Sequence, residues 1–91
     1  MSSHKLYFAV RVPDKVKKQV SKIPKHYQKA VYLALKDLES KPFQGKKLED
    51  KLKNKYSVRI GVYRILYEIY KKELIILVIS VGHRKDIYRR K

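Results

Sequence analysis

A chain of 91 residues without cysteine accommodates one domain, which we expect to span residues 1–91, and excludes both a disulfide framework and thiolate ligation of a metal. The formal net charge of +16 predicts a polyanionic partner, most often nucleic acid, rather than a membrane surface, because lysines occur in every segment. The longest apolar run, residues 74–79, is much shorter than a membrane-spanning helix and no signal-peptide pattern opens the chain, so we expect a cytoplasmic protein.

The first half of the chain is predicted to form one strand and two helices. Residues 5–12 place apolar side chains at every second position, which is typical of a strand. A short helix follows between Pro13 and Pro24, and a second helical stripe of apolar residues occupies residues 25–40. Residues 41–55 then form a lysine-rich connector.

The second half of the chain contains three strand-like runs, at residues 56–60, 63–69 and 74–81. Their connections are too short for parallel crossovers, so the runs are expected to be antiparallel. The last run is almost wholly apolar, which predicts a strand buried on both faces. We therefore expect an α+β fold of order β-α-α-β-β-β, a small antiparallel sheet of about four strands packed against an N-terminal helical hairpin.

A basic hairpin is the first candidate for function. Gly61 and Val62 suit a two-residue type II′ turn, and counting outward from it places Arg59 opposite Arg64. Like charges in directly opposed positions destabilise a sheet, so the pair predicts an anion such as a phosphate between the guanidinium groups. The alternative is that each arginine reaches solvent or pairs with a carboxylate, Glu68 or Asp86.

The segment after the last strand adds groups suited to phosphodiester chemistry. His83 can act as base or acid near neutral pH, and Arg84 adds a permanent positive charge. Tyr88 can stack on an unpaired base or offer its hydroxyl to a phosphate, or it can simply close the core. Cleavage of RNA by its own 2′-OH needs a base, an acid and cations at the charged transition state; His83 can serve as the base or the acid, and the arginines supply the cations.

Two segments resemble the RelE/ParE toxin superfamily of toxin–antitoxin systems: residues 63–69, YRILYEI, and residues 77–88, LVISVGHRKDIY. The looser similarity covers nearly the whole chain. The resemblance implies a microbial-ribonuclease-like fold and cleavage of mRNA in the ribosomal A site, without a metal or organic cofactor, leaving a 2′,3′-cyclic phosphate. It also implies an acidic antitoxin protein as partner, which suits the charge of this chain.

The resemblance assigns the candidate site residues. Arg64, Arg84 and Tyr88 match the family's catalytic arginines and tyrosine, and many RelE-like sequences carry Gly-His-Arg where this chain has His83. We expect His83 to transfer a proton and Arg59 to clamp the substrate. The best-known members carry two lysines on the strand before the hairpin, where this chain has Ser57 and Arg59.

Two other functions compete with the metal-independent endoribonuclease. One is inhibition of DNA gyrase by a ParE-like toxin, whose relatives commonly lack the full set of two arginines and a tyrosine. The other is a noncatalytic RNA- or ribosome-binding protein that keeps only the basic face. Tyr88 favours the ribonuclease.

Overall fold

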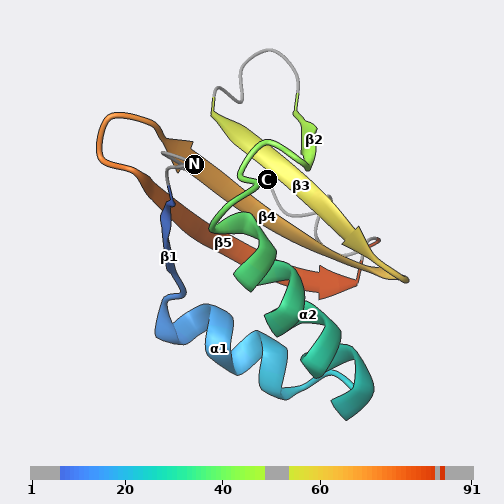
Figure 1. The fold of residues 1–91 in the computed structure, drawn as a ribbon. Helices are drawn as coiled ribbons and strands as arrows, with labels where there is room; N and C mark the ends of the chain where they lie inside the picture. The colour runs from blue at the N-terminus through green and yellow to red at the C-terminus, as the bar shows by residue number, and fades with distance from the viewer. Residues whose placement is uncertain (1–6, 49–53, 84, 86–91) are drawn as a thin grey trace, which may run out of the picture.

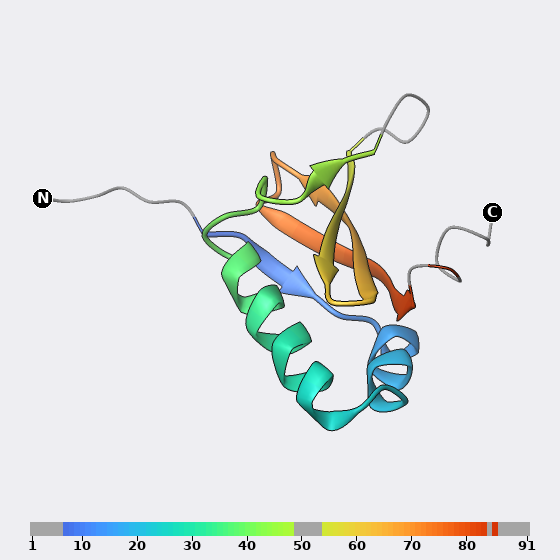
Figure 2. The ribbon, with the colours of Figure 1, turned by 90° about the vertical axis from the view of Figure 1, so that its right-hand side faces the viewer.

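The computed structural model of the protein describes residues 7–48, 54–83 and 85, and it consists of a helix layer on one face of a five-stranded sheet (Figure 1). The elements in chain order are β1 (Ala9–Arg11), α1 (Asp14–Ser21), α2 (Lys25–Leu38), β2 (Lys46–Lys47), β3 (Lys55–Ile60), β4 (Tyr63–Tyr70) and β5 (Ile75–His83). The strand order is β1-β5-β4-β3-β2. Figure 2 shows both helices on the same side of the sheet.

The core lies between the helices and this face of the sheet. Each helix carries an apolar stripe, and the stripe residues Val16, Val20, Val31, Leu35 and Leu38 are buried. Alternating residues of the two central strands complete the core, namely Ile65, Tyr67, Ile69, Ile76, Val78 and Val81. Because α1 and α2 both pack on this face, Ser57, Arg59 and Arg64 lie on the face of the sheet opposite the helices.

The predicted α+β class and the order β-α-α-β-β-β are confirmed, and the sheet differs from the expectation in three respects. It has a fifth, two-residue strand, β2, within the lysine-rich connector. It is mixed, because β1 pairs in parallel with β5 after the helical crossover. The strand β5 is buried on one face only, since its other face is half-exposed among the described residues.

The β3–β4 hairpin has the predicted register, with Arg59 opposite Arg64 and Ile60 opposite Tyr63. Gly61 has a φ of 62°, a left-handed conformation that suits glycine, and Val62 does not share a positive φ. This combination fits the expected type II′ turn. Among the described residues, no helix is long and apolar enough to cross a membrane.

Candidate functional site

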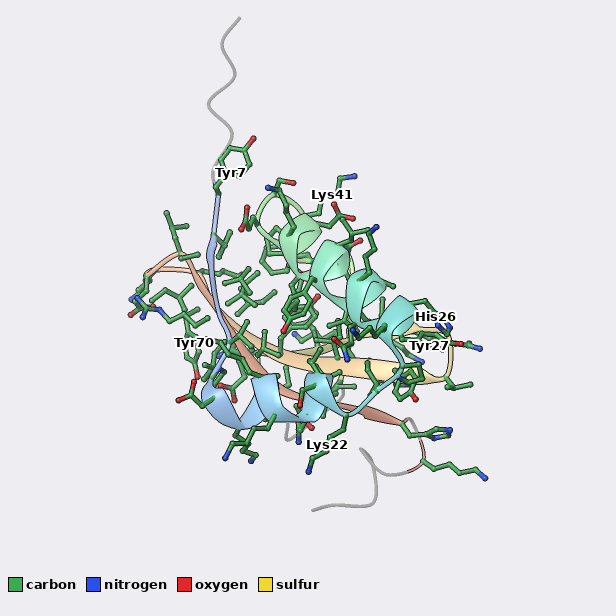
Figure 3. The ribbon with its side chains drawn as sticks, turned by 90° about the horizontal axis from the view of Figure 1, so that it is seen from below. Tyr7, Lys22, His26, Tyr27, Lys41 and Tyr70 are labelled. Carbon is green, nitrogen blue, oxygen red and sulfur yellow. The ribbon has the colours of Figure 1, made fainter. Side chains whose placement is uncertain are left out.

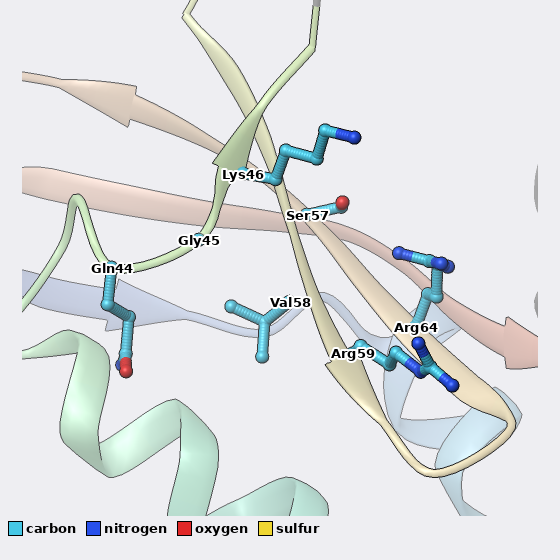
Figure 4. Close-up of a pocket in the computed structure, with 7 residues that line it drawn as sticks. All are labelled: Gln44, Gly45, Lys46, Ser57, Val58, Arg59 and Arg64. Carbon is cyan, nitrogen blue, oxygen red and sulfur yellow. The ribbon is translucent and has the colours of Figure 1, made fainter.

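A cavity of about 380 Å³ opens at the edge of the sheet beside β3, and Figure 4 shows the side chains around it. The lining residues are Gln44, Gly45, Lys46, Ser57, Val58, Arg59 and Arg64. Three of these seven carry a positive charge. The cavity therefore combines the predicted arginine pair with a basic residue of the connector, and this arrangement suits an anionic ligand.

The two arginines share one face of the sheet, but their side chains diverge (Figure 4). Arg59 points toward the hairpin turn, where its Nε donates a hydrogen bond of 3.3 Å to the carbonyl oxygen of Gly61. Arg64 points back along β4 toward Ser57, and its Nε is buried. Repulsion between opposed like charges favours this divergence, and an anion between the guanidinium groups would offset the repulsion.

The space beside Arg64 is open on the side of Gly82. Gly82 of β5 is the register partner of Arg64 on the side opposite Arg59. A Cβ added to Gly82 would meet no heavy atom within 4 Å. A ligand can therefore approach the sheet closely at Arg64.

Lys46 is a site residue that the sequence alone did not single out. Its strand, β2, places Lys46 opposite the buried Ser57, on the same face as Arg59 and Arg64. In Figure 4 the Lys46 side chain extends toward the same side of β3 as Ser57 and Arg64. Lys46 thus places a positive charge beside Ser57 on this face of the sheet.

His83 lies at the end of β5, in register with Tyr63 and at a ring distance of 6.0 Å from it. Because successive strand residues point to opposite faces, His83 faces the side opposite Arg64. The backbone N–H of Lys85 donates to Nδ1 of His83 at 3.2 Å, so the neutral ring carries its proton on Nε2. The structure therefore brings Arg59 and Arg64 together and places His83 around the end of the sheet.

An aromatic row connects His83 to the second helix. Tyr63 meets Tyr27 of α2 at a ring distance of 4.9 Å, and a Cβ on Gly61 would lie 2.7 Å from the Tyr27 ring. Figure 3 shows Tyr27 and His26 at the start of α2, next to the hairpin end of the sheet. This packing fixes the turn that carries Arg59 and Arg64.

The remaining predicted site residues, Arg84 and Tyr88, lie outside the described residues. Asp86, one of the carboxylates considered as an arginine partner, also lies outside them. Within residues 7–48, 54–83 and 85, no three His, Cys, Asp or Glu side chains gather so as to hold a metal ion.

The other carboxylate, Glu68, belongs to a separate ion pair. It is the register partner of Lys55, with which it forms a salt bridge, and it accepts a hydrogen bond from the Tyr70 hydroxyl. Desolvation by burial raises the pKa of Glu68, but the hydrogen bonds from Lys55 and Tyr70 outweigh it and the net pKa is lowered. None of these three residues lines the cavity.

Tyr67 stabilises residues 42–45, the segment whose Gln44 and Gly45 form one wall of the cavity. Its buried hydroxyl donates to the carbonyl oxygen of Pro42 at 2.9 Å and accepts from the N–H of Gly45 at 3.2 Å. Desolvation by burial raises the pKa of Tyr67 from 10.0 to about 12, although the Gly45 hydrogen bond lowers it. The hydroxyl is therefore neutral at physiological pH and bridges both ends of the segment that carries Gln44.

Tyr67→Phe is expected to lower the free energy of unfolding by about 1–3 kcal/mol at neutral pH, because two backbone groups lose their partner. The difference from the wild type should shrink between pH 10.0 and about 12. In that window the unfolded wild-type chain releases the Tyr67 proton while the folded chain retains it, so wild-type stability falls. Urea unfolding at several pH values measures both effects.

Tyr32→Phe is the matched control, because Tyr32 is exposed on α2. It should leave the free energy of unfolding within about 0.5 kcal/mol of the wild type. A Tyr67→Phe variant as stable as this control would contradict the bridging role of the hydroxyl.

Comparison with known families identifies the chain. The model of the family described as the ParE toxin of the type II toxin–antitoxin system parDE matches residues 7–88. The chain is a toxin of the RelE/ParE superfamily. The toxin is also 35% identical to Toxin RelG of Mycobacterium tuberculosis over 85 residues, which cover 91% of this chain and 98% of RelG.

Solved structures place the toxin in the RelE-like fold. The M. tuberculosis toxin–antitoxin complex RelBE2 contains a chain with a TM-score of 0.77 and 30% identity, covering 87% of the toxin and all (100%) of that chain. A free variant of E. coli RelE has a TM-score of 0.78 at 18% identity, covering 92% of the toxin and 93% of that chain, and supports the fold alone. The expected family and fold are confirmed.

Proposed function

We propose that this type II toxin is an endoribonuclease that cleaves mRNA, in the ribosomal A site, by attack of the 2′-OH on the adjacent phosphodiester. The observation that carries the proposal is the cavity in which Lys46, Arg59 and Arg64 surround Ser57 on the sheet face opposite the helices. Cations at fixed positions stabilise the charge that develops on the phosphorus oxygens in the transition state. Arginine suits this role because it stays protonated and binds phosphate in bidentate geometry.

The roles proposed for Arg64, Arg59 and Lys46 follow from where these groups lie, and the role proposed for His83 follows from its chemistry and from the sequence resemblance. Arg64, half-buried beside Gly82, stabilises the phosphorane, while Arg59 and Lys46 hold the flanking RNA backbone. His83 transfers a proton, either from the 2′-OH or to the departing 5′-oxygen. Arg84 and Tyr88 join the site on the strength of the sequence resemblance.

The reaction requires only groups of the chain and of the RNA. The 2′-oxygen forms a new bond to phosphorus as the bond to the 5′-oxygen breaks, the 2′-OH proton is accepted by a base, and the 5′-oxygen gains a proton. The products are a 2′,3′-cyclic phosphate and a 5′-hydroxyl. We propose that the chain acts as one domain, without a metal or organic cofactor.

We further propose an acidic antitoxin as the regulatory partner, and the cytoplasm, where ribosomes translate, as the place of action. Relatives of this toxin have been solved as complexes, among them RelBE2 of M. tuberculosis and a RelE–RelB complex of Pyrococcus horikoshii. A net charge of +16 favours an acidic protein that covers the basic face.

The test of the ribonuclease is primer-extension mapping of mRNA in a translating extract, with the purified toxin, with its Tyr88→Ala variant and without either. Cuts within translated codons that disappear in the variant would support ribosome-dependent cleavage. Intact mRNA in all three samples would overturn it.

Gyrase inhibition is the second candidate, because the matching family model is that of a ParE toxin. The same preparation should be added to a DNA supercoiling assay. Inhibited supercoiling together with intact mRNA would establish the ParE-like function in place of the ribonuclease.

Lys46→Ala is expected to slow cleavage at subsaturating RNA about tenfold, because it removes one cation from the cavity. Lys47→Ala is the matched control: Lys47 is the next residue of β2, has the same charge and does not line the cavity. It should change cleavage less than about twofold. Equal effects of the two substitutions would assign Lys46 to general attraction of RNA rather than to the site.

His83→Gln is expected to slow cleavage and to remove one limb of the pH–rate profile, because glutamine keeps hydrogen-bonding capacity but does not titrate. Single-turnover cleavage measured from about pH 5 to pH 9 checks this. A slower rate with an unchanged profile would assign His83 to positioning, through its contacts with Tyr63 and Lys85.

A further inference from the structure

The cavity extends beyond its cations, around the free edge of β3. Gln44 and Gly45 precede β2, and the pairing of β2 with β3 begins at Lys46 and Ser57, so the edge of β3 beyond Ser57 has no partner strand among the described residues. Both residues line the cavity together with Val58, which lies on the opposite side of β3 from Arg64 (Figure 4). One continuous space therefore connects a basic end with an end formed by an amide and an apolar side chain.

The wall at the amide end is held in one conformation. Residues 41–44 form a turn in which the N–H of Gln44 donates to the carbonyl oxygen of Lys41 at 3.2 Å. Pro42 occupies the second position of this turn, which its fixed φ favours. Tyr67 bonds Pro42 on one side of Gln44 and Gly45 on the other. The Gln44 backbone is thus preorganised, which lowers the entropic cost of binding a ligand.

Gly45 brings this wall as close to β3 as the backbone permits. A Cβ at Gly45 would lie 2.5 Å from the Tyr67 hydroxyl oxygen and 2.7 Å from the carbonyl oxygen of Ser57. Only glycine fits at this distance. The space between Gln44 and Val58 is therefore a feature built by close packing and not a gap left by a loose loop.

We propose that this end of the cavity binds a nucleobase, that of the nucleotide whose phosphate lies on Arg64. The inference rests on the proposed function, because it takes the phosphate position from it. Val58 offers an apolar contact for the base, and the Gln44 amide offers a donor and an acceptor side by side. Glutamine can pair in bidentate fashion with the N6 and N7 edge of adenine, so we use adenine as the reference base and expect it to add affinity over ribose phosphate.

The dimensions favour one unpaired nucleotide. A volume of about 380 Å³ is at the lower end of small-molecule sites and excludes a base pair. Proteins read RNA sequence mostly from unstacked single-stranded bases, which present their edges to side chains. A base bound here selects which phosphodiester reaches Arg64.

An added peptide strand is the competing occupant of a free strand edge, and the cavity disfavours it. A strand needs several consecutive backbone groups to pair with. Here the free edge of β3 reaches only from Val58 to the turn at Gly61, and the wall formed by Gln44 and Gly45 closes one end. The cations on the cavity rim favour a nucleotide over a neutral peptide.

The test is a titration of the full chain, followed by NMR, with the four nucleoside 3′-monophosphates and with ribose phosphate that lacks a base. Adenosine monophosphate is expected to bind at least about fivefold more tightly than ribose phosphate and than the least favoured nucleotide. Gln44→Ala should reduce the spread among the four bases to within about twofold and leave the affinity for ribose phosphate unchanged. Gln44 is exposed, so the variant is expected to fold, and its melting temperature confirms this.

Three results would overturn the base site. Ribose phosphate binding as tightly as the nucleotides would show that only the phosphate is held, and the proposed function would stand. A base preference that survives Gln44→Ala would place base recognition elsewhere. If no phosphate compound binds and Arg64→Ala leaves the rate of mRNA cleavage unchanged, the proposed phosphate site is wrong, and the base site is wrong with it.

Discussion

Replacing Arg64 by alanine is expected to lower the single-turnover rate of mRNA cleavage on programmed ribosomes by a factor on the order of a hundred to a thousand. The loss of one preorganised donor to a developing negative charge has effects of this size in other enzymes. Arg64 is half-buried, points along β4 toward the cavity and has clear space on its Gly82 side. Its charge therefore acts at short range and at a fixed position.

The matched control is Arg11→Ala. Arg11 is exposed on β1, three strands away from β3 in the same sheet, and it does not line the cavity. Its replacement by alanine removes the same charge as Arg64→Ala. Its cleavage rate should fall less than about threefold, through weaker long-range attraction alone. The cleavage rate of Arg64→Lys should lie between the rates of Arg64→Ala and Arg11→Ala, because lysine keeps the charge and loses the bidentate geometry. Equal rates for Arg64→Ala and Arg11→Ala would remove Arg64 from the site.

Binding and chemistry must be separated in this experiment. One arginine fewer lowers RNA affinity modestly and nearly independently of sequence, and it reduces the slope of the salt dependence by about one. The rate at saturating ribosomes reports chemistry instead. A noncatalytic RNA-binding protein would show the affinity change and no cleavage in the wild type.

The hairpin was predictable from the sequence because local rules determine it. A two-residue turn at Gly61 leaves one register for the flanking strands, and a period of two then assigns each side chain to a face. The opposition of Arg59 and Arg64 follows from counting alone. This register was predicted without the family resemblance, and the structure confirms it.

The second basic partner was not predictable in the same way. Lys46 lies among the lysines of the connector, and a two-residue strand has no periodicity that distinguishes it from its neighbours. The contact of Lys46 with the site depends on pairing between segments 11 positions apart, Lys46 and Ser57. The sequence likewise did not identify β5 as the strand that pairs with β1, because this pairing joins the two ends of the described chain.

The position of His83 shows how sequence proximity differs from proximity in a strand. His83 follows Gly82, the register partner of Arg64, yet the alternation of side chains turns its ring toward Tyr63 on the other face. A bulge at Leu66 and Tyr67 shifts the β4–β5 register, so counting along β5 from its apolar start assigns the wrong face beyond it. If His83 transfers a proton to or from the phosphodiester held by Arg64, the RNA at that position must also reach around the end of the sheet to the face of Tyr27 and Tyr63.

Replacing the glycines by alanine is the second change expected to have a large effect, here on stability, and Gly82 serves as the control for Gly45 and Gly61. Gly45→Ala and Gly61→Ala are each expected to lower the free energy of unfolding by about 1–3 kcal/mol, because the new methyl group must displace packed atoms. At Gly45 these are the Tyr67 hydroxyl and the Ser57 carbonyl, and at Gly61 the Tyr27 ring together with a φ of 62°. A domain of this size loses roughly 4–8 °C of melting temperature per kcal/mol.

Gly82→Ala is the control, since its Cβ meets nothing within 4 Å in an extended strand. It should melt at the wild-type temperature or slightly above, because alanine restricts the unfolded chain more than glycine does. Thermal unfolding followed by circular dichroism ranks the three variants. Gly45→Ala as stable as Gly82→Ala would mean that the turn of residues 41–44 does not pack on Tyr67, and the preorganised wall of the cavity would then have no physical basis.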